Sequence, residues 1–587
     1  MKRSSRLFAL ALPVLWGCAS DPVAVADAPA QPRLDLSAAA DAPLVFTAEN
    51  SGAGITPPTF PDFADLPVSP LLPDPFRPYM GGPRDISMAG WQNRRAEFKA
   101  VQEKYEIGPK PAPSEVAITA SYTPTNATAG TLRVLVRRLS TGDTLTLTSA
   151  VALPTTITGP VPAIIGMNSP SGGIPADIFT SRNIARITYS HNNVTTYGRK
   201  AATDAFYRLY PEYAGTGVSG QYSAWSWGVS RLIDGLQLLA SQPGTTLPIN
   251  TSRLAVAGCS YAGKMALYAG ALDERIALTL PIESGGGGAP AWRVNHAIEP
   301  NGRVEKTDNT DGSWFINNVL KAQFRGDSVY KLPGDHHELM AMVAPRGLLV
   351  TGNTDFEWLG NEANYVSSRA AQATYETLGV GDRFGFYIDG QHGHCQIPTA
   401  QRPVFEAFVE RFLLDQNANT AVRVHPFGNL DYQSWMPWAN SPSMQQVAMD
   451  VQPGQISVST TAVVNVVLYG AAGFDAAAVD AANVRLVVNG GNDDNGLFTN
   501  TSFPQVMVYN VPPVAPIMRG TMVNSSVADV NGDGRPDRVI GFSTAALRAA
   551  GYLPGYSTLW LRPATAPYAW MAFDVTGNFV TRPRVVQ

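Results

Sequence analysis

Short apolar runs separated by amphipathic stretches fill the middle of the chain. Apolar and polar positions alternate as in half-buried strands at 114–122, 130–139 and 143–153. Compact, fully apolar runs follow at 162–168, 183–190, 253–258, 277–283, 346–352 and 384–389. Helical patterns lie between several of them, for example at 224–240 and 364–379. Apolar strands alternating with helices predict an α/β fold whose mostly parallel sheet is covered on both faces.

The two ends of the chain follow different patterns. A basic start, MKRSSR, and a short apolar run predict a bacterial export signal over 1–18, with Cys18 as a lipid-attachment site. An Ala-, Asp- and Pro-rich stretch predicts a flexible linker over 19–54, before the main α/β domain at 55–418. A second linker is expected at 419–450. Residues 451–587 predict a β-rich accessory domain, because their strand-like runs are short and helical signals are few.

Composition narrows the class of protein. Hydrophobic residues make up 45% of the 587 positions and charged residues 15%, so a large core is expected. The net charge of −4, without any basic run, gives no argument for nucleic acid. Apart from the N-terminal signal, no 18-residue apolar run predicts a spanning helix, so only the lipid would attach the protein to a membrane. We therefore expect an exported protein, at the cell surface or in the periplasm and otherwise secreted, and a monomer.

Several residues suited to catalysis directly follow predicted strands. Ser260 lies between the apolar run RLAVA and a helical stretch, in the sequence GCSYAGK. Glu283 ends the next apolar run, Asp355 and Glu357 follow the one after it, and His392 and His394 follow the last. The carboxyl ends of parallel strands meet at one edge of a sheet. The chain order Ser, acid, His is that of the α/β-hydrolases, three-layer sandwiches in which a base takes the serine proton and a carboxylate orients that base.

The residues alone leave alternatives open at each position. Ser260 could instead cap a helix, and the usual G-x-S-x-G spacing fails because the second glycine comes late, at Gly263. Fold logic favours Asp355 or Glu357 as the acid over Glu283. His392 and His394 cannot be distinguished by spacing. The cluster Asp335-His336-His337 is interpreted as structural, because no third metal ligand is suitably spaced.

A separate motif lies near the C-terminus, at 529–537, with the sequence DVNGDGRPD. Its side chains Asp529, Asn531, Asp533 and Asp537, with the carbonyl group of Arg535, have the spacing of a calcium loop. No glutamate follows at the twelfth position, which is Ile540, so the loop is not an EF-hand. The spacing predicts a structural Ca²⁺, with a polar β-turn as the alternative.

Residues 60–415 resemble the glucuronoyl esterases of carbohydrate esterase family 15, in particular bacterial members. The segments LPDPF, AWSWGVSRLIDGL, GCSYAGK, LTLPIESGGGGAPAWR, GDHHELMAMVAPRGLLV, FEWLG and HGHCQIP resemble family segments in the same order. GCSYAGK is similar to the family's G-C-S-R-x-G-K, so the late glycine belongs to the family pattern. Glu283 precedes a glycine run, SGGGG, whose composition predicts a flexible segment.

The resemblance implies roles for individual residues. Ser260 would be the nucleophile, His394 the base and Glu283 the acid, with Asp355 or Glu357 as a possible second acid. Cys259 and Cys395 would form a disulfide. Lys264, Glu305 and Trp358 match positions that bind the glucuronate ring, and no cofactor is implied for catalysis.

One position departs from the family pattern. Tyr261 stands where the family has an arginine that helps to stabilise the oxyanion, so only its backbone N–H and phenol remain as donors. The implied activity is hydrolysis of 4-O-methyl-glucuronate esters, of the kind that join glucuronoxylan to lignin alcohols. The alternatives are another carbohydrate esterase, acting on acetyl or feruloyl esters, and a surface lipoprotein that binds acidic glycan without turnover.

Overall fold

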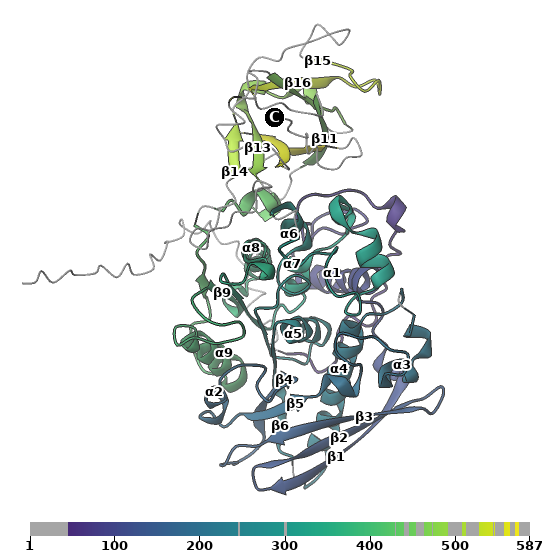
Figure 1. Cartoon of the computed structure of the whole chain (residues 1–587), viewed down its shortest axis with the longest axis vertical. Coiled ribbons are helices and arrows are strands. Elements are labelled where there is room, and N and C mark those ends of the chain that lie inside the picture. The colour runs from purple at the N-terminus through teal and green to yellow at the C-terminus, as the bar shows by residue number, and fades with distance from the viewer. Residues whose placement is uncertain are drawn as a thin grey trace, which may run out of the picture. The chain divides into compact units, whose positions relative to one another are not determined.

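The computed structural model contains two β-sheets (Figure 1). It describes residues 45–215, 217–244, 247–298, 302–428, 430–439, 445–452, 463–471, 474–490, 508–511, 527–543, 545, 557–563 and 570–574. The predicted export signal and Cys18 lie outside these residues, and so do parts of the predicted accessory domain at 451–587. No helix in the described ranges is both long and apolar enough to span a membrane.

The larger sheet has ten strands in the order β1-β2-β3-β5-β4-β6-β7-β8-β9-β10. Strands β1, β2, β3 and β5 pair antiparallel, and every pairing from β5 through β4 and β6 to β10 is parallel. The strands are β1 Val116–Asn126, β2 Ala129–Arg138, β3 Thr144–Ala152, β4 Val161–Met167, β5 Ala185–Tyr189, β6 Ile249–Cys259, β7 Leu278–Ile282, β8 Gly347–Asn353, β9 Phe384–Asp389 and β10 Arg423–Val424. The predicted strands and the mostly parallel sheet are confirmed.

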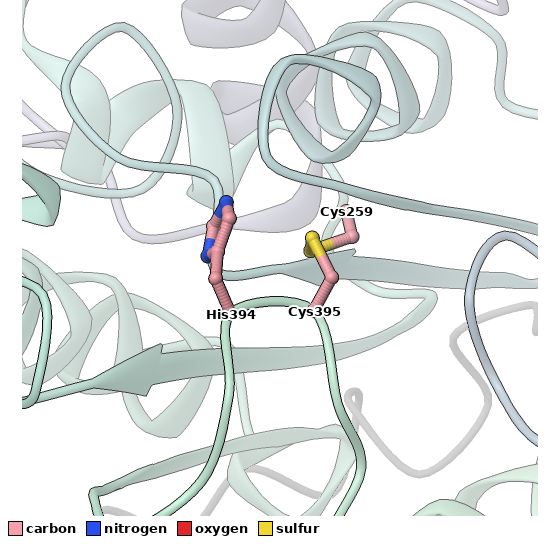
Figure 2. A group of neighbouring side chains, drawn as sticks. All are labelled: Cys259, His394 and Cys395. Carbon is pink, nitrogen blue, oxygen red and sulfur yellow. A yellow bond between two sulfur atoms is a disulfide. The ribbon is translucent and has the colours of Figure 1, made fainter.

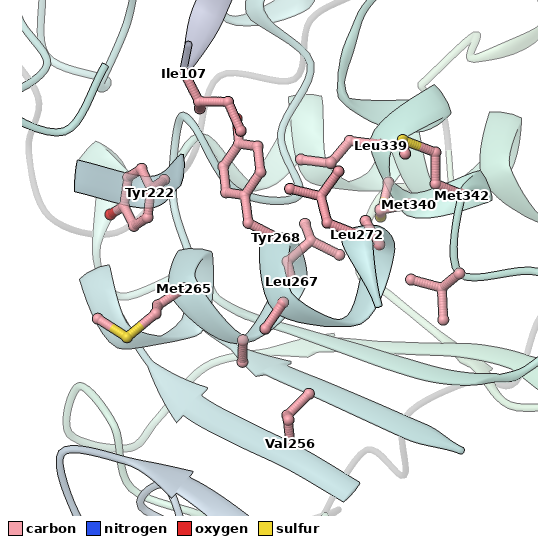
Figure 3. Packing of buried hydrophobic residues seen from close by; sticks show 14 of the residues in the cluster. Ile107, Tyr222, Val256, Met265, Leu267, Tyr268, Leu272, Leu339, Met340 and Met342 are labelled. Atoms are coloured by element: carbon pink, nitrogen blue, oxygen red, sulfur yellow. The ribbon is translucent and has the colours of Figure 1, made fainter. Parts of the chain in front are cut away.

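Alternation along the central strands builds a core on each face of this sheet. Val256 packs into the larger apolar cluster, with α4 (Gln221–Ala240), α5 (Tyr261–Leu272) and α8 (Asn361–Thr377). Its neighbours Ala255 and Ala257 pack into a second cluster, with α2 (Asp177–Thr180) and α9 (Arg402–Leu414). Figure 3 shows the first cluster around α5, where Leu267, Tyr268 and Leu272 lie among residues from other helices. Two covered faces explain why these strands are apolar throughout.

The remaining helices of this region complete the cover. They are α1 (Met88–Val101), α3 (Ala205–Leu209), α6 (Trp292–Ile298) and α7 (His336–Ala341). Helix α1 begins at a Ser87 cap, whose side chain accepts from Gly90 N, yet its sequence is rich in charged residues. Arg94 and Arg95 are nevertheless buried, with their guanidinium groups bound to backbone carbonyl groups and carboxylates.

The predicted linker over 19–54 is wrong for its last part. Backbone hydrogen bonds join Phe46 N to Glu274 O and Glu274 N to Glu49 O, at 3.1 and 2.9 Å. The Glu49 carboxylate is inserted among basic side chains, with Lys110 Nζ at 2.5 Å and Arg231 also paired to it. Burial raises the pKa of Glu49, but Lys110 and Arg231 outweigh this and lower it below its usual value. Residues 45–54 therefore belong to the folded body.

The second predicted linker, 419–450, also contains packed residues. Strand β10 pairs with β9, and Trp435 and Trp438 are buried in the larger apolar cluster. Trp438 Nε1 donates to Leu72 O at 3.0 Å, and Leu72 N donates to Trp435 O at 3.0 Å. Indole burial of this kind contributes a large apolar area, and it holds the proline-rich segment around Leu72 in place.

The C-terminal sheet consists of eight described strands in the order β14-β13-β17-β18-β11-β12-β16-β15. All its described pairings are antiparallel except that of β11 with β18. The strands are β11 Gln445–Gln452, β12 Val463–Leu468, β13 Val484–Gly490, β14 Val508–Val511, β15 Val527–Ala528, β16 Asp537–Ser543, β17 Ser557–Pro563 and β18 Trp570–Asp574. Its own apolar cluster includes Met449, Val466 and Phe542. The region after 445 is thus β-rich, as its short alternating runs predict.

Candidate active site

Ser260 lies on a sharp turn between β6 and α5. Its backbone has φ 58° and ψ −127°, a region that non-glycine residues rarely adopt. The turn is held by hydrogen bonds from Ser260 N to Ile282 O at 2.9 Å and from Gly263 N to Ser260 O at 2.8 Å. Such a strained strand-to-helix turn is the nucleophile elbow of α/β-hydrolases.

Both glycines of GCSYAGK are required by close backbone approaches. A Cβ added at Gly258 would lie 2.1 Å from Ala262 O. One added at Gly263 would lie 2.6 Å from Ile282 O, on the neighbouring strand β7. The second glycine therefore lets α5 approach β7, which explains its position one residue later than usual.

The acid and base meet at the carboxyl edge of the sheet. Glu283 directly follows β7 and is buried, with a positive φ of 43°. Its Oε2 lies 2.6 Å from His394 Nδ1 and accepts a hydrogen bond from Cys395 N at 3.1 Å. A carboxylate bound at Nδ1 leaves Nε2 of the imidazole as the nitrogen for proton transfer.

A disulfide between Cys259 and Cys395 joins the serine turn to the histidine loop, as the resemblance implies (Figure 2). The two Cα atoms are 5.7 Å apart, and 136 positions separate them in the sequence. The His394 ring lies beside the bridge, with a ring nitrogen and both sulfur atoms within 4.8 Å of one another. The base is thereby kept next to the residue that precedes Ser260.

Removing this bridge is expected to lower both stability and turnover. Replacing both cysteines by serine should reduce the free energy of unfolding by about 2–5 kcal/mol, because the bridge closes a long loop. Thermal and urea unfolding of the variant and the wild type measure the change. Peptide mapping of the non-reduced wild type should show the linked pair, and alkylation of both thiols without reduction would contradict the bridge.

The other candidate acids have different partners. Asp355 Oδ2 accepts from Gln391 N at 2.7 Å and from His392 N at 3.2 Å, so it holds the backbone of the histidine loop. Glu357 is exposed and pairs with Arg303 at 3.4 Å. Neither forms a hydrogen bond with His394 among the described residues. The fold-based preference for these two acids is therefore not supported by the structure, which pairs Glu283 with the base.

Buried Lys264 and partly buried Glu305 form a polar pair one helical turn from Ser260. Lys264 Nζ lies 2.7 Å from Glu305 Oε2 and over the Trp314 ring, 5.0 Å from its centroid. Glu305 Oε1 accepts from Thr310 Oγ1 at 2.7 Å. Trp358 is 43% exposed, and its ring packs edge-on against His394 with centroids 5.4 Å apart. This set offers N–H donors, carboxylate acceptors and an exposed aromatic ring.

The glycine run after Glu283 is buried rather than flexible, which corrects the expectation from its composition. A Cβ at Gly286 would lie 2.1 Å from Glu305 O, so the run lets the Glu305 segment approach closely. The carbonyl group of Gly288 contacts His336 Nδ1, and Glu106 binds the other ring nitrogen of His336 at 2.9 Å. Burial lowers the pKa of His336, but Glu106 outweighs this and raises it above its usual value.

The Tyr261 side chain lies in an aromatic group beside the serine turn. Its ring centroid is 4.1 Å from that of Tyr197, which is 46% exposed, and 5.8 Å from that of His191. Its hydroxyl oxygen accepts from Asn168 Nδ2 at 3.2 Å, and burial raises the phenol pKa. Tyr261 is also the first residue of α5, where backbone N–H groups have no partner within the helix.

Some residues of the site were not predicted from the sequence. Asp389, at the end of β9, binds His392 Nε2 at 3.0 Å, and burial raises its pKa. Its place as the last residue of a predicted strand was a usable signal. Asn168 also follows a strand, β4, but Tyr197 and Trp314 lie in segments that carry no recognisable motif.

Among the described residues, neither the histidine loop nor the Asp335–His337 cluster forms a metal centre. Only Cys259, His394 and Cys395 bring three possible ligand side chains together in these ranges, and the two cysteines are oxidised to a disulfide. His336 and His337 are buried and hydrogen-bonded to protein groups. The Asp335 carboxylate pairs with Arg293 at 3.0 Å. These contacts agree with a structural role for the Asp335–His337 cluster.

The 529–537 loop uses its carboxylates to close its own turn. Asp529 Oδ1 accepts from Gly532 N and Asp533 N, at 2.7 and 3.0 Å. Asp537 is buried and accepts from Val530 N and Gly470 N, at 2.7 and 2.9 Å. The acidic side chains of the loop do not converge as a three-carboxylate group, so calcium at this loop stays a prediction.

A parallel sheet, a strained serine turn and a carboxylate-bound histidine at one edge define an α/β-hydrolase of the carboxylic ester hydrolase class. A family model for fungal glucuronyl esterases matches residues 136–379. A 4-O-methyl-glucuronoyl methylesterase of Cerrena unicolor is 37% identical over 382 residues, which are 62% of this chain and 75% of that protein. The chain belongs to the glucuronoyl esterase family.

Two solved structures extend the similarity to three dimensions. One is a serine-to-alanine mutant of the Sporotrichum thermophile glucuronoyl esterase with methyl 4-O-methyl-β-D-glucopyranuronate, with 31% identity and a TM-score of 0.57 over 65% of this chain and 98% of that chain. The other is a carbohydrate esterase family 15 enzyme of Caldicellulosiruptor kristjansonii, with 29% identity and a TM-score of 0.52 over 63% and 98%. The matching family model and the Cerrena relative are fungal, so the expected likeness to bacterial members in particular is not supported.

Proposed function

We propose that this protein hydrolyses esters of 4-O-methyl-glucuronic acid through an acyl-enzyme on Ser260. The observation that carries the proposal is the pairing of buried Glu283 with half-buried His394 beside the Ser260 turn, with the Lys264–Glu305 pair one helical turn away. The first pair suits acyl transfer and the second suits a hydroxyl-rich acid. The family relatives carry the same activity in their names.

The reaction follows from the placement of these groups. Ser260 Oγ attacks the ester carbonyl carbon and passes its proton to His394 Nε2, while Glu283 stabilises the resulting imidazolium. The Tyr261 N–H, at the first position of α5 where the helix itself supplies no acceptor, donates to the oxyanion. His394 then protonates the leaving alcohol. Water enters, gives a proton to the same nitrogen and releases the uronic acid from Ser260.

Recognition is concentrated on the acid side of the ester. Lys264 Nζ keeps N–H donors beyond the one directed at Glu305, and the Glu305 carboxylate has acceptor sites for sugar hydroxyl groups. Because the two charges neutralise each other, the pair binds polar hydroxyl groups without requiring a charged ligand. Trp358 offers an exposed ring face for the apolar side of the sugar.

A panel of three esters tests the proposal: benzyl glucuronate, an acetylated xylo-oligosaccharide and methyl ferulate. We expect the glucuronate ester to have the highest kcat/KM, and Lys264→Met to lower only that value. A preference for the acetyl or feruloyl ester would support the alternative esterase. Binding of glucuronoxylan without turnover of any ester would support the non-catalytic alternative.

Replacing Tyr261 by arginine is expected to raise turnover. A guanidinium group near the oxyanion is a charge-assisted donor, so we expect kcat on benzyl glucuronate to rise by roughly 10-fold with a smaller change in KM. Steady-state kinetics of the wild type and of Tyr261→Arg measure kcat and KM. Tyr261→Phe, which keeps the ring contact with Tyr197, is the control and should change kcat little. A large fall in Tyr261→Phe would show that the phenol already serves the oxyanion.

We further propose an exported, monomeric enzyme that acts on glucuronoxylan or lignin–carbohydrate esters. The export signal and Cys18 support a lipid anchor from sequence alone, and the disulfide suits an oxidising compartment. A β-rich accessory domain from 451, with Ca²⁺ at 529–537, completes this proposal.

A further inference from the structure

His392 is a second imidazole on the same buried carboxylate. Its Nδ1 lies 3.7 Å from Glu283 Oε1, whereas His394 Nδ1 lies 2.6 Å from Oε2. The His392 side chain is only 4% exposed, and that of Glu283 is 1% exposed. Two histidines therefore flank one carboxylate, although the reaction described above uses only one of them.

Hydrogen bonds fix where His392 carries its proton when neutral. Asn353 Oδ1 accepts from Asp355 N at 3.1 Å, so Asn353 Nδ2 is the atom that faces His392 Nδ1, also at 3.1 Å. An Nδ1 that accepts from an amide is unprotonated. The ring proton is then on Nε2, where Asp389 Oδ1 accepts it at 3.0 Å.

The surroundings also accommodate a charged His392. The carbonyl oxygen of Gly393 lies 3.2 Å from Nδ1 and can accept a proton placed there, while Glu283 Oε1 supplies the opposite charge. The ionisable groups around the ring are Glu283 after β7, Asp389 at the end of β9, His394 in the same loop and Asp355 after β8. Asp355 binds the His392 backbone N–H rather than the ring, and Gln401 adds an uncharged amide that donates to Asp389 at 2.6 Å.

We propose that His392, held by Asp389, is a positioning residue that controls how much of the Glu283 charge is available to His394. When His392 is neutral, Glu283 stabilises only the His394 imidazolium that forms during acyl transfer. When His392 takes a proton from solvent on Nδ1, two imidazolium ions share one carboxylate, and the imidazolium of the reaction is less well stabilised. The active form therefore requires both histidines to be neutral before substrate binds.

The pH dependence of kcat/KM tests this inference, which rests on the proposed triad but not on the natural substrate. Because two protons must be lost, a plot of log kcat/KM against pH for the wild type is expected to reach a slope of two on its acid limb, which we call a two-proton slope. His392→Asn keeps an acceptor for Asn353 but cannot be charged, so its acid limb should have a one-proton slope. Measuring p-nitrophenyl acetate beside benzyl glucuronate keeps a failure of the glucuronate assignment separate from a failure of this inference.

Two further variants guard against a folding defect. Asp389→Asn removes the carboxylate that favours the charged ring, and it should also give a one-proton slope. Asp355→Asn is the matched control, because its carboxylate contacts the same loop but not the ring, and it should keep the two-proton slope. A one-proton limb in the wild type, or a two-proton limb that persists in His392→Asn, would overturn the inference. Circular dichroism defines the pH range in which each variant is folded.

Discussion

Ser260→Ala and His394→Ala are each expected to lower kcat by about 10³-fold or more, as removal of a triad member does. Ser260 supplies the attacking oxygen from its strained turn, and His394 is the only imidazole that Glu283 binds at hydrogen-bond distance, 2.6 Å, among the described residues. Without either group, proton transfer from the nucleophile is lost. Turnover of benzyl glucuronate, with disulfide content and melting temperature as folding checks, measures the effect.

His392 lies in the same loop as His394 and is the matched control for this prediction. His392→Ala should lose much less activity than His394→Ala at neutral pH, because His392 acts only through Glu283. The two residues are separated by a single glycine, so a substitution at either one should disturb the conformation of the loop to a similar extent. An inactive His392→Ala together with an active His394→Ala would show that the base has been assigned to the wrong histidine.

Glu283→Gln is expected to lower kcat by about 10³-fold with little change in KM, as amide replacement of a triad carboxylate does. The carboxylate accepts from His394 Nδ1 and from Cys395 N, and a glutamine can present an amide NH₂ to the imidazole instead. The base is then held in the wrong tautomer and its imidazolium loses the opposite charge. Kinetics on benzyl glucuronate at neutral pH measure both constants.

Asp355→Asn is the matched control for this second prediction. Asp355 binds backbone N–H groups of the histidine loop, so its loss should loosen that loop and reduce turnover much less than the loss at Glu283. Equal partial losses in the two variants would mean that two acids share the imidazolium. In that case the Glu283–His394 pair would be only one of two acid–base pairs that support turnover.

The parallel strands of the main sheet were predictable because burial on both faces requires continuous apolar runs, whereas β1, β2 and β3 were predictable from the alternation of half-buried strands. The order of Ser260, Glu283 and His394 after three different strands, β6, β7 and β9, was predictable for the same reason. The boundaries of the linkers were harder to predict from the sequence. Residues 45–54 have the composition of a tether, yet the Glu49 carboxylate pairs with Lys110 and Arg231, which come from distant segments.

The sequence by itself determined the class of the fold, the family and the position of the serine turn, since these depend on local patterns and short motifs. The residue pattern left open the choice between Glu283 and Asp355 and between His394 and His392; the family resemblance implied Glu283 and His394, and only the tertiary structure shows the contact that pairs them. The spacing of the candidates along the chain is equivalent, but Glu283 points to His394 Nδ1 while Asp355 points to loop backbone. The resemblance placed the late Gly263 in the family pattern, but only the tertiary structure gives its physical reason, the approach of α5 to β7. Contacts between side chains from separate strands depend on packing in three dimensions, which no local pattern encodes.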